Sequence, residues 1–152
     1  MVVPKIDVTD ESIIDAEPSD VFKALLDEFE GAKNWWMPHW EAKPSGKVPF
    51  RQIGGVIYIT VHRIGKPQWS AKSTEIIQNK LLKADFFEGD FLGSGEWNLE
   101  QLDGKTKVKF RFNVKTNKLL FTLVSPIVNI GNIHSDVMQK GFTALNSYLS
   151  KK

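Results

Sequence analysis

Cysteine is absent from the 152 residues of this chain. Its absence excludes a disulfide framework, a thiolate metal site and a cysteine nucleophile. Long hydrophobic runs are also missing, because the longest, Leu119–Val124, is far shorter than the roughly 20 residues that span a bilayer. Met1–Glu11 has no apolar run behind a basic head, so no signal peptide is expected. We therefore expect a cytoplasmic protein without an integral membrane segment.

The motifs of the common catalytic and cofactor sites are missing as well. The three histidines, His39, His62 and His134, do not stand at the spacings at which zinc ligands converge. Gly54-Gly55 lacks the following helix and lysine of a phosphate-binding loop, and no serine lies in a nucleophile elbow. The sequence thus predicts no metal site and no cofactor.

Repeats, linkers and low-complexity tracts are absent, and the length is that of one domain. A chain of this size buries roughly 68–70% of its unfolded surface around a single core. We therefore expect residues 1–152 to form one domain. The sequence itself predicts no oligomeric state.

Charge is nearly balanced at +2, but residues 1–46 carry −6 and residues 47–152 carry +8. Such asymmetry can indicate a nucleic-acid surface. The basic stripe that decides the question consists of Lys107, Lys109 and Arg111. Glu96 and Glu100 lie on the same solvent-facing side of the preceding strand, so cross-strand ion pairs explain the stripe better than nucleic-acid binding.

Aromatic residues are concentrated in one short segment, which holds three of the five tryptophans: Trp35, Trp36, Met37, Pro38, His39 and Trp40. Large rings where an element ends usually close over something apolar. We expect Trp36 and Trp40 at the rim of a hydrophobic cavity, Trp35 packed on helices and His39 as a loop residue. The alternative is that these rings cap an ordinary core.

The N-terminal third predicts one strand and two short helices. Ile6–Ala16 reads as extended, and Pro18 then begins a helix with an apolar face at three- and four-residue spacing. Gly31 ends this pattern, and residues 32–37 predict a second short helix, which Pro38 interrupts. Residues 41–47 read as a polar segment.

After Gly46 the period becomes alternating, which predicts an antiparallel meander with one buried face. The expected strands are Val56–Ile64, Trp69–Gln78, Leu81–Glu88, Glu96–Leu102 and Lys107–Lys115. Gly93-Ser94-Gly95 is taken as part of a turn. Asp103-Gly104 predicts a type I′ hairpin turn with two positive φ angles.

Residues 117–152 are helical by pattern. A single helix would place one apolar stripe toward the sheet, formed by Leu120, Val124, Ile127, Gly131, His134, Met138, Phe142, Leu145 and Leu149. Pro126, Gly131 and Gly141 predict bends or a break. His134 lies on the apolar stripe, which indicates a polar anchor or a general acid/base in a cavity, or alternatively a half-buried histidine at a helix start.

This order of elements predicts an α+β fold. Six or seven antiparallel strands should curl into a curved sheet, with a long C-terminal helix across its concave face. The residues expected to line a cavity between them are Trp36, Trp40, Ile59, Trp69, Phe86, Trp97, Phe110, Phe112, His134 and Met138. The alternative for these side chains is simple core packing.

Three segments resemble a known family. Ile14–Phe22, Trp35–Trp40 and the hairpin Gly93–Val108 are similar to the helix entry, tryptophan loop and strand pair of the START-like (SRPBCC) superfamily with the helix-grip fold, in particular its polyketide cyclase/dehydrase and lipid-transport group. Glu17 departs from the family's entry pattern. The resemblance implies that a hydrophobic small molecule, lipid-like or aromatic, is held between the sheet and the terminal helix.

Two other hypotheses follow from the same scaffold. A cyclase or dehydratase would move protons through His134 and a second group such as Glu75 or Tyr58, although strand alternation turns Tyr58 away from the cavity. A chaperone-activator-like domain would instead bind a protein through the basic stripe. A non-catalytic binding protein is favoured, because no catalytic motif is present.

Overall fold

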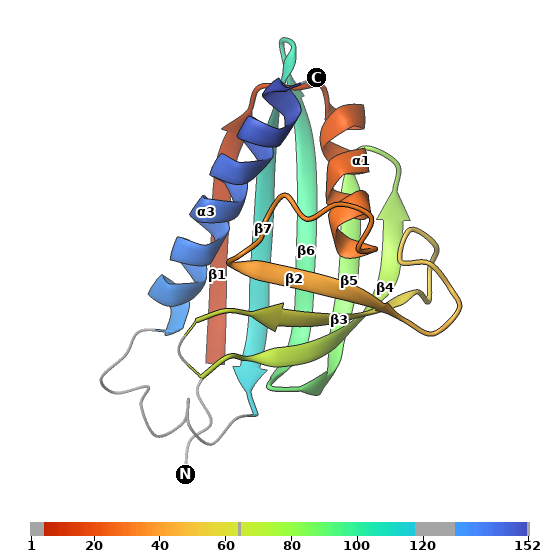
Figure 1. Cartoon of the computed structure of the whole chain (residues 1–152), viewed down its shortest axis with the longest axis vertical. Coiled ribbons are helices and arrows are strands. Elements are labelled where there is room, and N and C mark those ends of the chain that lie inside the picture. The colour runs from red at the N-terminus through yellow and green to blue at the C-terminus, as the bar shows by residue number, and fades with distance from the viewer. Residues whose placement is uncertain (1–4, 64, 118–129, 152) are drawn as a thin grey trace.

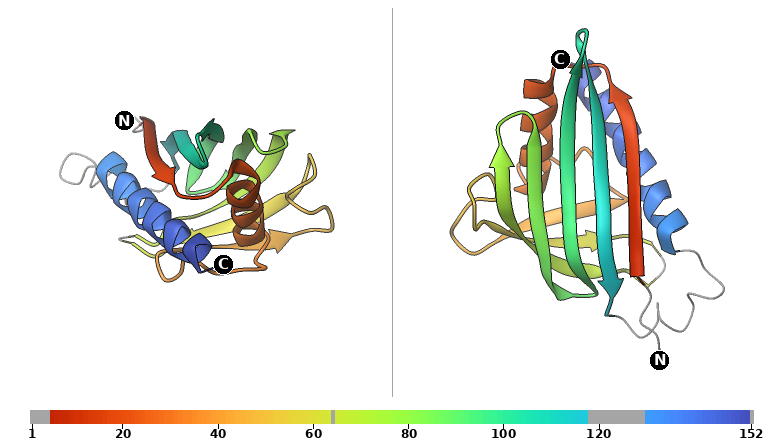
Figure 2. Two further views of the ribbon diagram at one scale, coloured as in Figure 1. Left: turned by 90° about the horizontal axis from the view of Figure 1, so that it is seen from above. Right: turned by 180° about the vertical axis from the view of Figure 1, so that it is seen from behind.

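The computed structural model of the chain describes residues 5–63, 65–117 and 130–151. These residues form a seven-stranded antiparallel sheet that curls around two helices (Figures 1 and 2). The strands are β1 (Lys5–Ile14), β2 (Trp40–Ser45), β3 (Val56–Val61), β4 (Gln68–Ile77), β5 (Leu81–Gly89), β6 (Phe91–Leu102) and β7 (Lys105–Thr116), and the helices are α1 (Pro18–Phe29) and α3 (Ile130–Ser150). The predicted α+β helix-grip class is confirmed.

The strand order β1-β7-β6-β5-β4-β3-β2 places the first strand at one edge and the second at the other. The chain crosses between these edges through α1 and then returns as a meander. β1 pairs with β7 along its whole length, from Lys5 opposite Lys115 to Ile14 opposite Thr106. Because α3 packs mainly on β1, the inward side chains of this edge strand lie under the helix.

Residues 32–37 form turns rather than the predicted second helix. The Glu28 carboxylate accepts the backbone N–H groups of Trp35 and Trp36, at 3.1 and 3.2 Å. A side chain from α1 thus satisfies amides that a helix would have satisfied with its own carbonyls. Periodicity within the segment could not show this partner.

The polar segment after Trp40 contains a strand that sequence reasoning missed. β2 pairs with β3 and forms an edge of the sheet, with Trp40 opposite Val61 and Ser45 opposite Val56. An edge strand tolerates proline because one side of its backbone needs no ladder partner, and Pro44 lies in this strand. Trp40 and Ala42 face inward and are buried.

Gly93-Ser94-Gly95 lies inside β6 and is not a turn. A Cβ atom at Gly93 would fall 2.2 Å from the carbonyl oxygen of Asn113, and one at Gly95 would fall 2.7 Å from Cζ of Phe86. The glycines therefore permit close packing within the sheet. The Asp103-Gly104 hairpin is confirmed, but of its two residues only Gly104 has a positive φ, 79°, so the turn is not type I′.

α3 runs without a break through Gly131 and Gly141. The predicted apolar stripe is confirmed where it is described, because Met138, Phe142, Leu145 and Leu149 are buried. Leu120, Val124, Pro126 and Ile127 lie outside the described residues. Gly141 lets α3 pack closely on the ring of Trp36 and does not interrupt the helix, because a Cβ there would fall 2.3 Å from Cε2 of Trp36.

The outer face of the sheet carries the basic stripe. Arg111 donates two hydrogen bonds to the Asp7 carboxylate, at 2.9 and 2.7 Å, while Glu11 lies 3.8 Å from the ammonium groups of Lys107 and Lys109. Ion pairs were predicted here, but with acids of β6. The acids within 4 Å come instead from β1, which pairs with β7 on the side away from β6, a neighbourhood that only the sheet topology shows.

Candidate functional site

A cavity of about 80 Å³ lies between the concave face of the sheet and α3. The structure brings all ten residues of the predicted set to its wall: Trp36, Trp40, Ile59, Trp69, Phe86, Trp97, Phe110, Phe112, His134 and Met138. Strand alternation places the sheet residues on one face, and the stripe of α3 supplies the last two. The lining side chains are mostly aromatic or aliphatic. The charged or titratable ones are those of Arg63 and His134.

The floor of the cavity is a set of packed rings on neighbouring strands. Trp97 of β6 and Phe110 of β7 stand opposite each other, with ring centroids 4.5 Å apart, and Phe86 of β5 lies 5.9 Å from Phe112. Gly95 lies between these rings, and a Cβ there would fall 2.7 Å from Phe86 and 3.0 Å from Phe110. The absence of a side chain therefore lets the two rings pack closely against the sheet.

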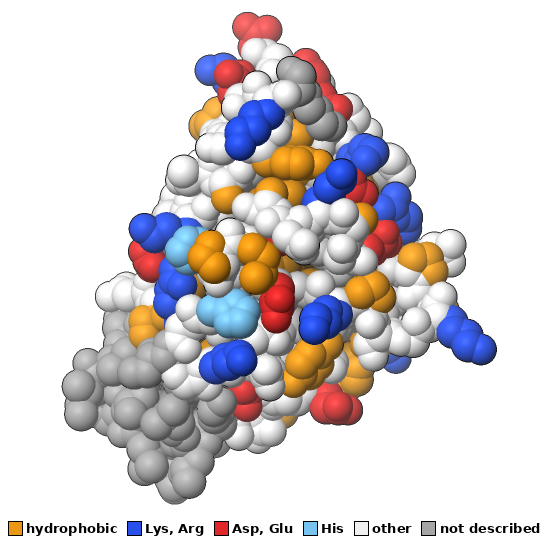
Figure 3. All heavy atoms as spheres, viewed as in Figure 1, with side chains coloured by type: hydrophobic (Ala, Val, Ile, Leu, Met, Phe, Trp, Pro, Cys, Tyr) orange, Lys and Arg blue, Asp and Glu red, His pale blue; other side chains and the backbone are white. Residues whose placement is uncertain are grey.

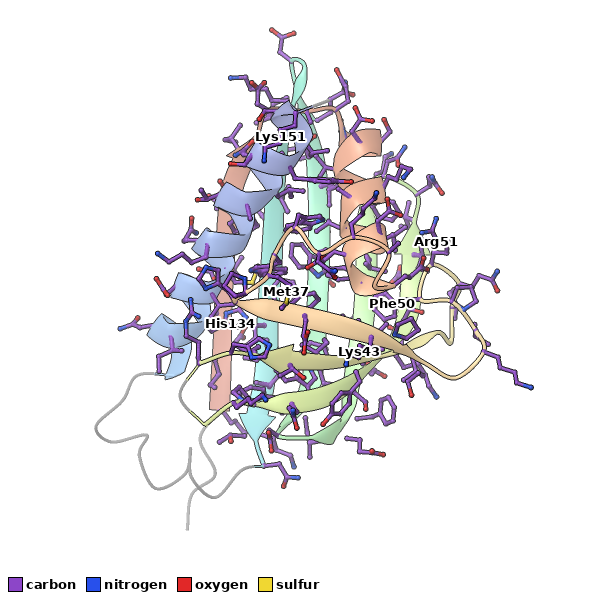
Figure 4. All side chains as sticks on the ribbon, viewed as in Figure 1. Met37, Lys43, Phe50, Arg51, His134 and Lys151 are labelled. Carbon is purple, nitrogen blue, oxygen red and sulfur yellow. The ribbon has the colours of Figure 1, made fainter. Side chains whose placement is uncertain are left out.

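Trp36 forms the wall that links the sheet to α3. Its ring stacks on Trp40 at 4.5 Å, and its Nε1–H donates a 3.2 Å hydrogen bond to the carbonyl of Val137. Trp35 lies behind it, stacked on Trp36 at 5.6 Å and donating to the Ala24 carbonyl of α1 at 3.0 Å. Met37 is 41% exposed and lies at the outer surface of the same turn (Figure 4). Figure 3 shows hydrophobic side chains among charged ones on this face of the molecule.

Glu28 holds this turn in place and is one of three buried acids, with Asp10 and Asp27, that were not predicted from the sequence. Its side chain is 2% exposed, and burial raises the pKa of its carboxyl to about 7, against the hydrogen bonds from the Trp35 and Trp36 amides. The signal was visible, because Glu28 falls three residues after Leu25 and beside Phe29 on the apolar face of α1.

His134 enters the cavity wall from the N-terminal part of α3 (Figure 4). Its ring stacks on Phe112, with centroids 4.0 Å apart and planes at 13°. Its Nδ1 lies 3.4 Å from Oδ2 of Asp10, which is 8% exposed. Asp10 is the second missed acid, although it occupies the inward alternation of Ile6 and Ile14 on β1.

Burial lowers the pKa of His134, and the neighbouring Asp10 carboxylate only partly opposes this effect. Burial also disfavours ionised Asp10, but the side chains of His134 and Ser135 outweigh it by hydrogen bonding and hold the pKa of Asp10 below its ordinary value. The stable combination is a neutral imidazole beside a carboxylate. A carboxylate at Nδ1 favours the tautomer that leaves the Nε2 lone pair for another partner.

Arg63 is the second polar lining residue. Its Nη2 lies 2.9 Å from Nδ1 of His39 and 3.3 Å from the Asp136 carboxylate of α3. Burial, followed by the positive charge of Arg63, lowers the pKa of His39. His39 is thus a loop residue that joins the turn to the end of β3, as predicted.

Neither partner proposed for His134 in the cyclase hypothesis reaches the cavity. Tyr58 is 40% exposed on the other face of β3, where its hydroxyl bonds to Gln68 at 3.0 Å, and Glu75 is exposed on β4. Asp10 replaces them as the acid nearest to His134. Among residues 5–63, 65–117 and 130–151, no three metal-ligating side chains cluster, and no helix is long and apolar enough to cross a membrane.

No family model and no curated protein matches this chain. Solved structures match this chain along almost its whole length. A START superfamily protein from Mycobacterium smegmatis superposes with a TM-score of 0.72 at 12% identity, covering 95% of this chain and 97% of that one. Ara h 8.0201 gives 0.68 at 20% identity, covering 98% and 100%. The ZhuI aromatase/cyclase from Streptomyces sp. R1128 gives 0.69 at 14%, covering 97% and 95%. The predicted START-like resemblance is thereby confirmed at the level of the fold.

Proposed function

We propose that this protein binds a hydrophobic small molecule, lipid-like or aromatic, in the cavity between the sheet and α3. The observation that carries the proposal is the composition of the wall, in which rings and aliphatic side chains from both layers surround an unfilled space and Arg63 and His134 supply the polar groups. Ligand sites combine an apolar lining with few polar groups in this way. Neighbours of the same fold include a START superfamily protein and an aromatase/cyclase, which favours this use of the scaffold.

The size of the cavity restricts the proposal. Its volume of about 80 Å³ is smaller than the roughly 150 Å³ of an apolar cavity that holds benzene, and drug-sized ligands occupy about 300–1,000 Å³. Even a ligand of one ring therefore requires the wall to move. Met138 is the most adaptable lining side chain, because its thioether has three rotatable bonds and no branch.

Tryptophan fluorescence tests the proposal directly, because four of the five tryptophans line the cavity: Trp36, Trp40, Trp69 and Trp97. We expect saturable changes in emission on titration with compounds ordered by size, from toluene through naphthalene to a medium-chain fatty acid. Native mass spectrometry of protein purified from its own host should also show a retained mass. Failure of every probe in both measurements would contradict the proposal.

A matched pair of variants separates cavity binding from surface adsorption. Ala84→Leu adds three carbon atoms at a lining position and should abolish the titration, whereas the exposed Ala32→Leu should leave it unchanged. Equal responses of the two variants would place the probe outside the cavity. Thermal denaturation of both variants confirms that the protein remains folded.

The second candidate function is proton transfer on a bound substrate, and the pairing of Asp10 with His134 favours it. A neutral imidazole oriented by a carboxylate is a general base. Turnover of an identified ligand that is lost in His134→Ala, with binding retained, would establish catalysis. The hypothesis of protein binding through the basic stripe is weaker, because Asp7 and Glu11 offset two of its three positive charges. A cytoplasmic location stays a prediction of the sequence.

A further inference from the structure

Trp69 is the most enclosed polar side chain of the cavity floor. It stands on β4 opposite Ile59 of β3 and is 4% exposed. Two phenylalanine rings meet it nearly edge-on, Phe91 at 5.0 Å and Phe86 at 5.6 Å, and the Phe112 ring lies 6.2 Å away. The indole is therefore embedded in aromatic carbon and contacts the cavity.

The Nε1–H of Trp69 is buried and has no hydrogen-bond partner in the described part of the chain. The indole N–H groups of Trp35 and Trp36 behave differently, because each donates to a backbone carbonyl. A buried donor without an acceptor costs folding free energy, and such exceptions in native proteins call for an explanation. Phenylalanine would fill the same apolar surroundings without that cost.

The second polar group near the floor is His134, and both groups contact one ring. His134 stacks on Phe112 at 4.0 Å, while Trp69 meets the same phenylalanine at 6.2 Å. Both side chains also line the cavity. Both side chains therefore lie in the region around Phe112, within an otherwise apolar floor. A donor held in that region is suited to an acceptor atom of a molecule inside the cavity.

We infer that Trp69 is a specificity-determining residue, whose Nε1–H donates a hydrogen bond to an acceptor oxygen of the ligand, so that the cavity favours ring compounds with a carbonyl or ether oxygen over the bare hydrocarbon. This inference rests on the proposed function, since it needs a molecule in the cavity. It assigns a role to the one indole donor among Trp35, Trp36 and Trp69 that the fold leaves unpaired.

The test uses two probes of the same shape, cyclopentanone and methylenecyclopentane, which differ in C=O against C=CH₂. Dissociation constants are measured by NMR titration on the wild-type protein and on Trp69→Phe. We expect the substitution to weaken binding of the ketone, relative to the hydrocarbon, by about five- to tenfold, the range of one net hydrogen bond. Trp35→Phe, the same change at a tryptophan outside the cavity lining, should leave that ratio unaltered.

A second readout does not depend on the folding of a variant. The indole N–H resonance of Trp69 in the wild-type protein should move downfield when the ketone binds and not when the hydrocarbon binds. If both probes bind while the ratio and the resonance are unchanged, the inference is overturned and the proposed function stands. If neither probe binds, the proposed function fails for single-ring ligands. An ordered water that stays on Nε1 in the ketone complex would also overturn the inference.

Discussion

Glu28 and Asp10 are two of the three carboxylates buried in the described part of the chain, and their surroundings drive their pKa values in opposite directions. The third, Asp27, is paired with Lys23 and Arg51. Glu28, on α1, has its pKa raised to about 7, whereas the pKa of Asp10, on β1, is lowered. Burial is the largest influence on both carboxyls and by itself would raise both pKa values. At Glu28 burial outweighs the hydrogen bonds from two backbone amides, whereas at Asp10 the side chains of His134 and Ser135 outweigh burial.

The comparison shows what each acid does. Glu28 accepts two amides and fixes the turn that carries Trp36, so its role is structural and its charge is disfavoured. Asp10 stays ionised beside His134, a group that lines the cavity and can exchange a proton. Chemistry, if the cavity performs any, is therefore expected at the Asp10 end. The Glu28 end determines whether the wall keeps its shape.

The largest expected effect concerns Glu28 and pH. An acid whose pKa is raised in the folded state destabilises that state as the pH rises from the unfolded pKa of 4.5 to about 7. At 1.36 kcal/mol per pKa unit, this amounts to at most about 3 kcal/mol. Urea denaturation at pH 4.5 and pH 8 should show that Glu28→Gln removes this loss.

The exposed Glu75→Gln is the matched control and should keep the wild-type pH profile. His134 acts in the opposite direction over part of this range. Its lowered pKa makes the folded state lose stability as the pH falls below 6.5, so only the difference between variant and wild type isolates Glu28. A pH-independent difference would show that Glu28 is ionised throughout, like Asp10, and would remove the contrast.

The next effect concerns the Asp10 pair. His134→Phe keeps a ring against Phe112 but takes a hydrogen-bonding partner from a buried carboxylate, and we expect a loss of about 2 kcal/mol at pH 7. The difference in stability between variant and wild type should become smaller as the pH falls below 6.5. The wild type loses stability there, because its buried histidine resists protonation in the folded state. Calorimetric unfolding between pH 4 and pH 8 measures both.

A double variant tests whether the loss arises from Asp10. Asp10→Leu in the His134→Phe background should recover most of the stability, because no buried carboxylate is left without its partner. Simple addition of the two single losses would mean that the residues do not interact. The Asp10 end would then be ordinary packing around Phe112.

The smallest effect is expected at the exposed carboxylate of Asp7, which is the reference for the buried carboxylates of Asp10 and Glu28. Hydrogen bonding to Arg111 lowers the pKa of Asp7, yet both side chains are about half exposed. Solvent and salt screen such pairs. Arg111→Gln should change the denaturation midpoint little, and not measurably at 0.5 M NaCl. A loss as large as that of His134→Phe would show that exposure is not what separates these acids.

Much of the fold could be predicted because alternation and helical periodicity are local. The meander from Val56 to Thr116, the helix that begins at Pro18 and the apolar stripe of α3 were all visible in the pattern. The errors lie where a distant group changes the local outcome. No helix forms over residues 32–37, where the Glu28 carboxylate accepts the backbone N–H groups of Trp35 and Trp36. The strand β2 was missed because its pairing with β3 outweighs its polar composition.

The candidate site was predictable to about the same extent as the fold. Inward positions on strands and helix gave eight of the ten lining residues, including His134, because each follows from phase. Trp36 and Trp40 were placed instead from the aromatic density of their segment and its resemblance to a known family. Asp10 and Glu28 were not predicted, although each interrupts an apolar face. The candidate residues were chosen among aromatic rings and histidines, and acids on inward faces were not considered. The unpaired Nε1–H of Trp69 could not be predicted, since it depends on every atom around it.

The sequence by itself determined the order of the elements and which side chains face inward, because both depend on the spacing of residues along one strand or helix. Only the tertiary structure decided how large the cavity is, which acids lie beside Trp36 and His134, and which buried donor lacks an acceptor. These properties arise where β1, β4, α1 and α3 meet, and they depend on differences of an ångström between segments far apart in the chain.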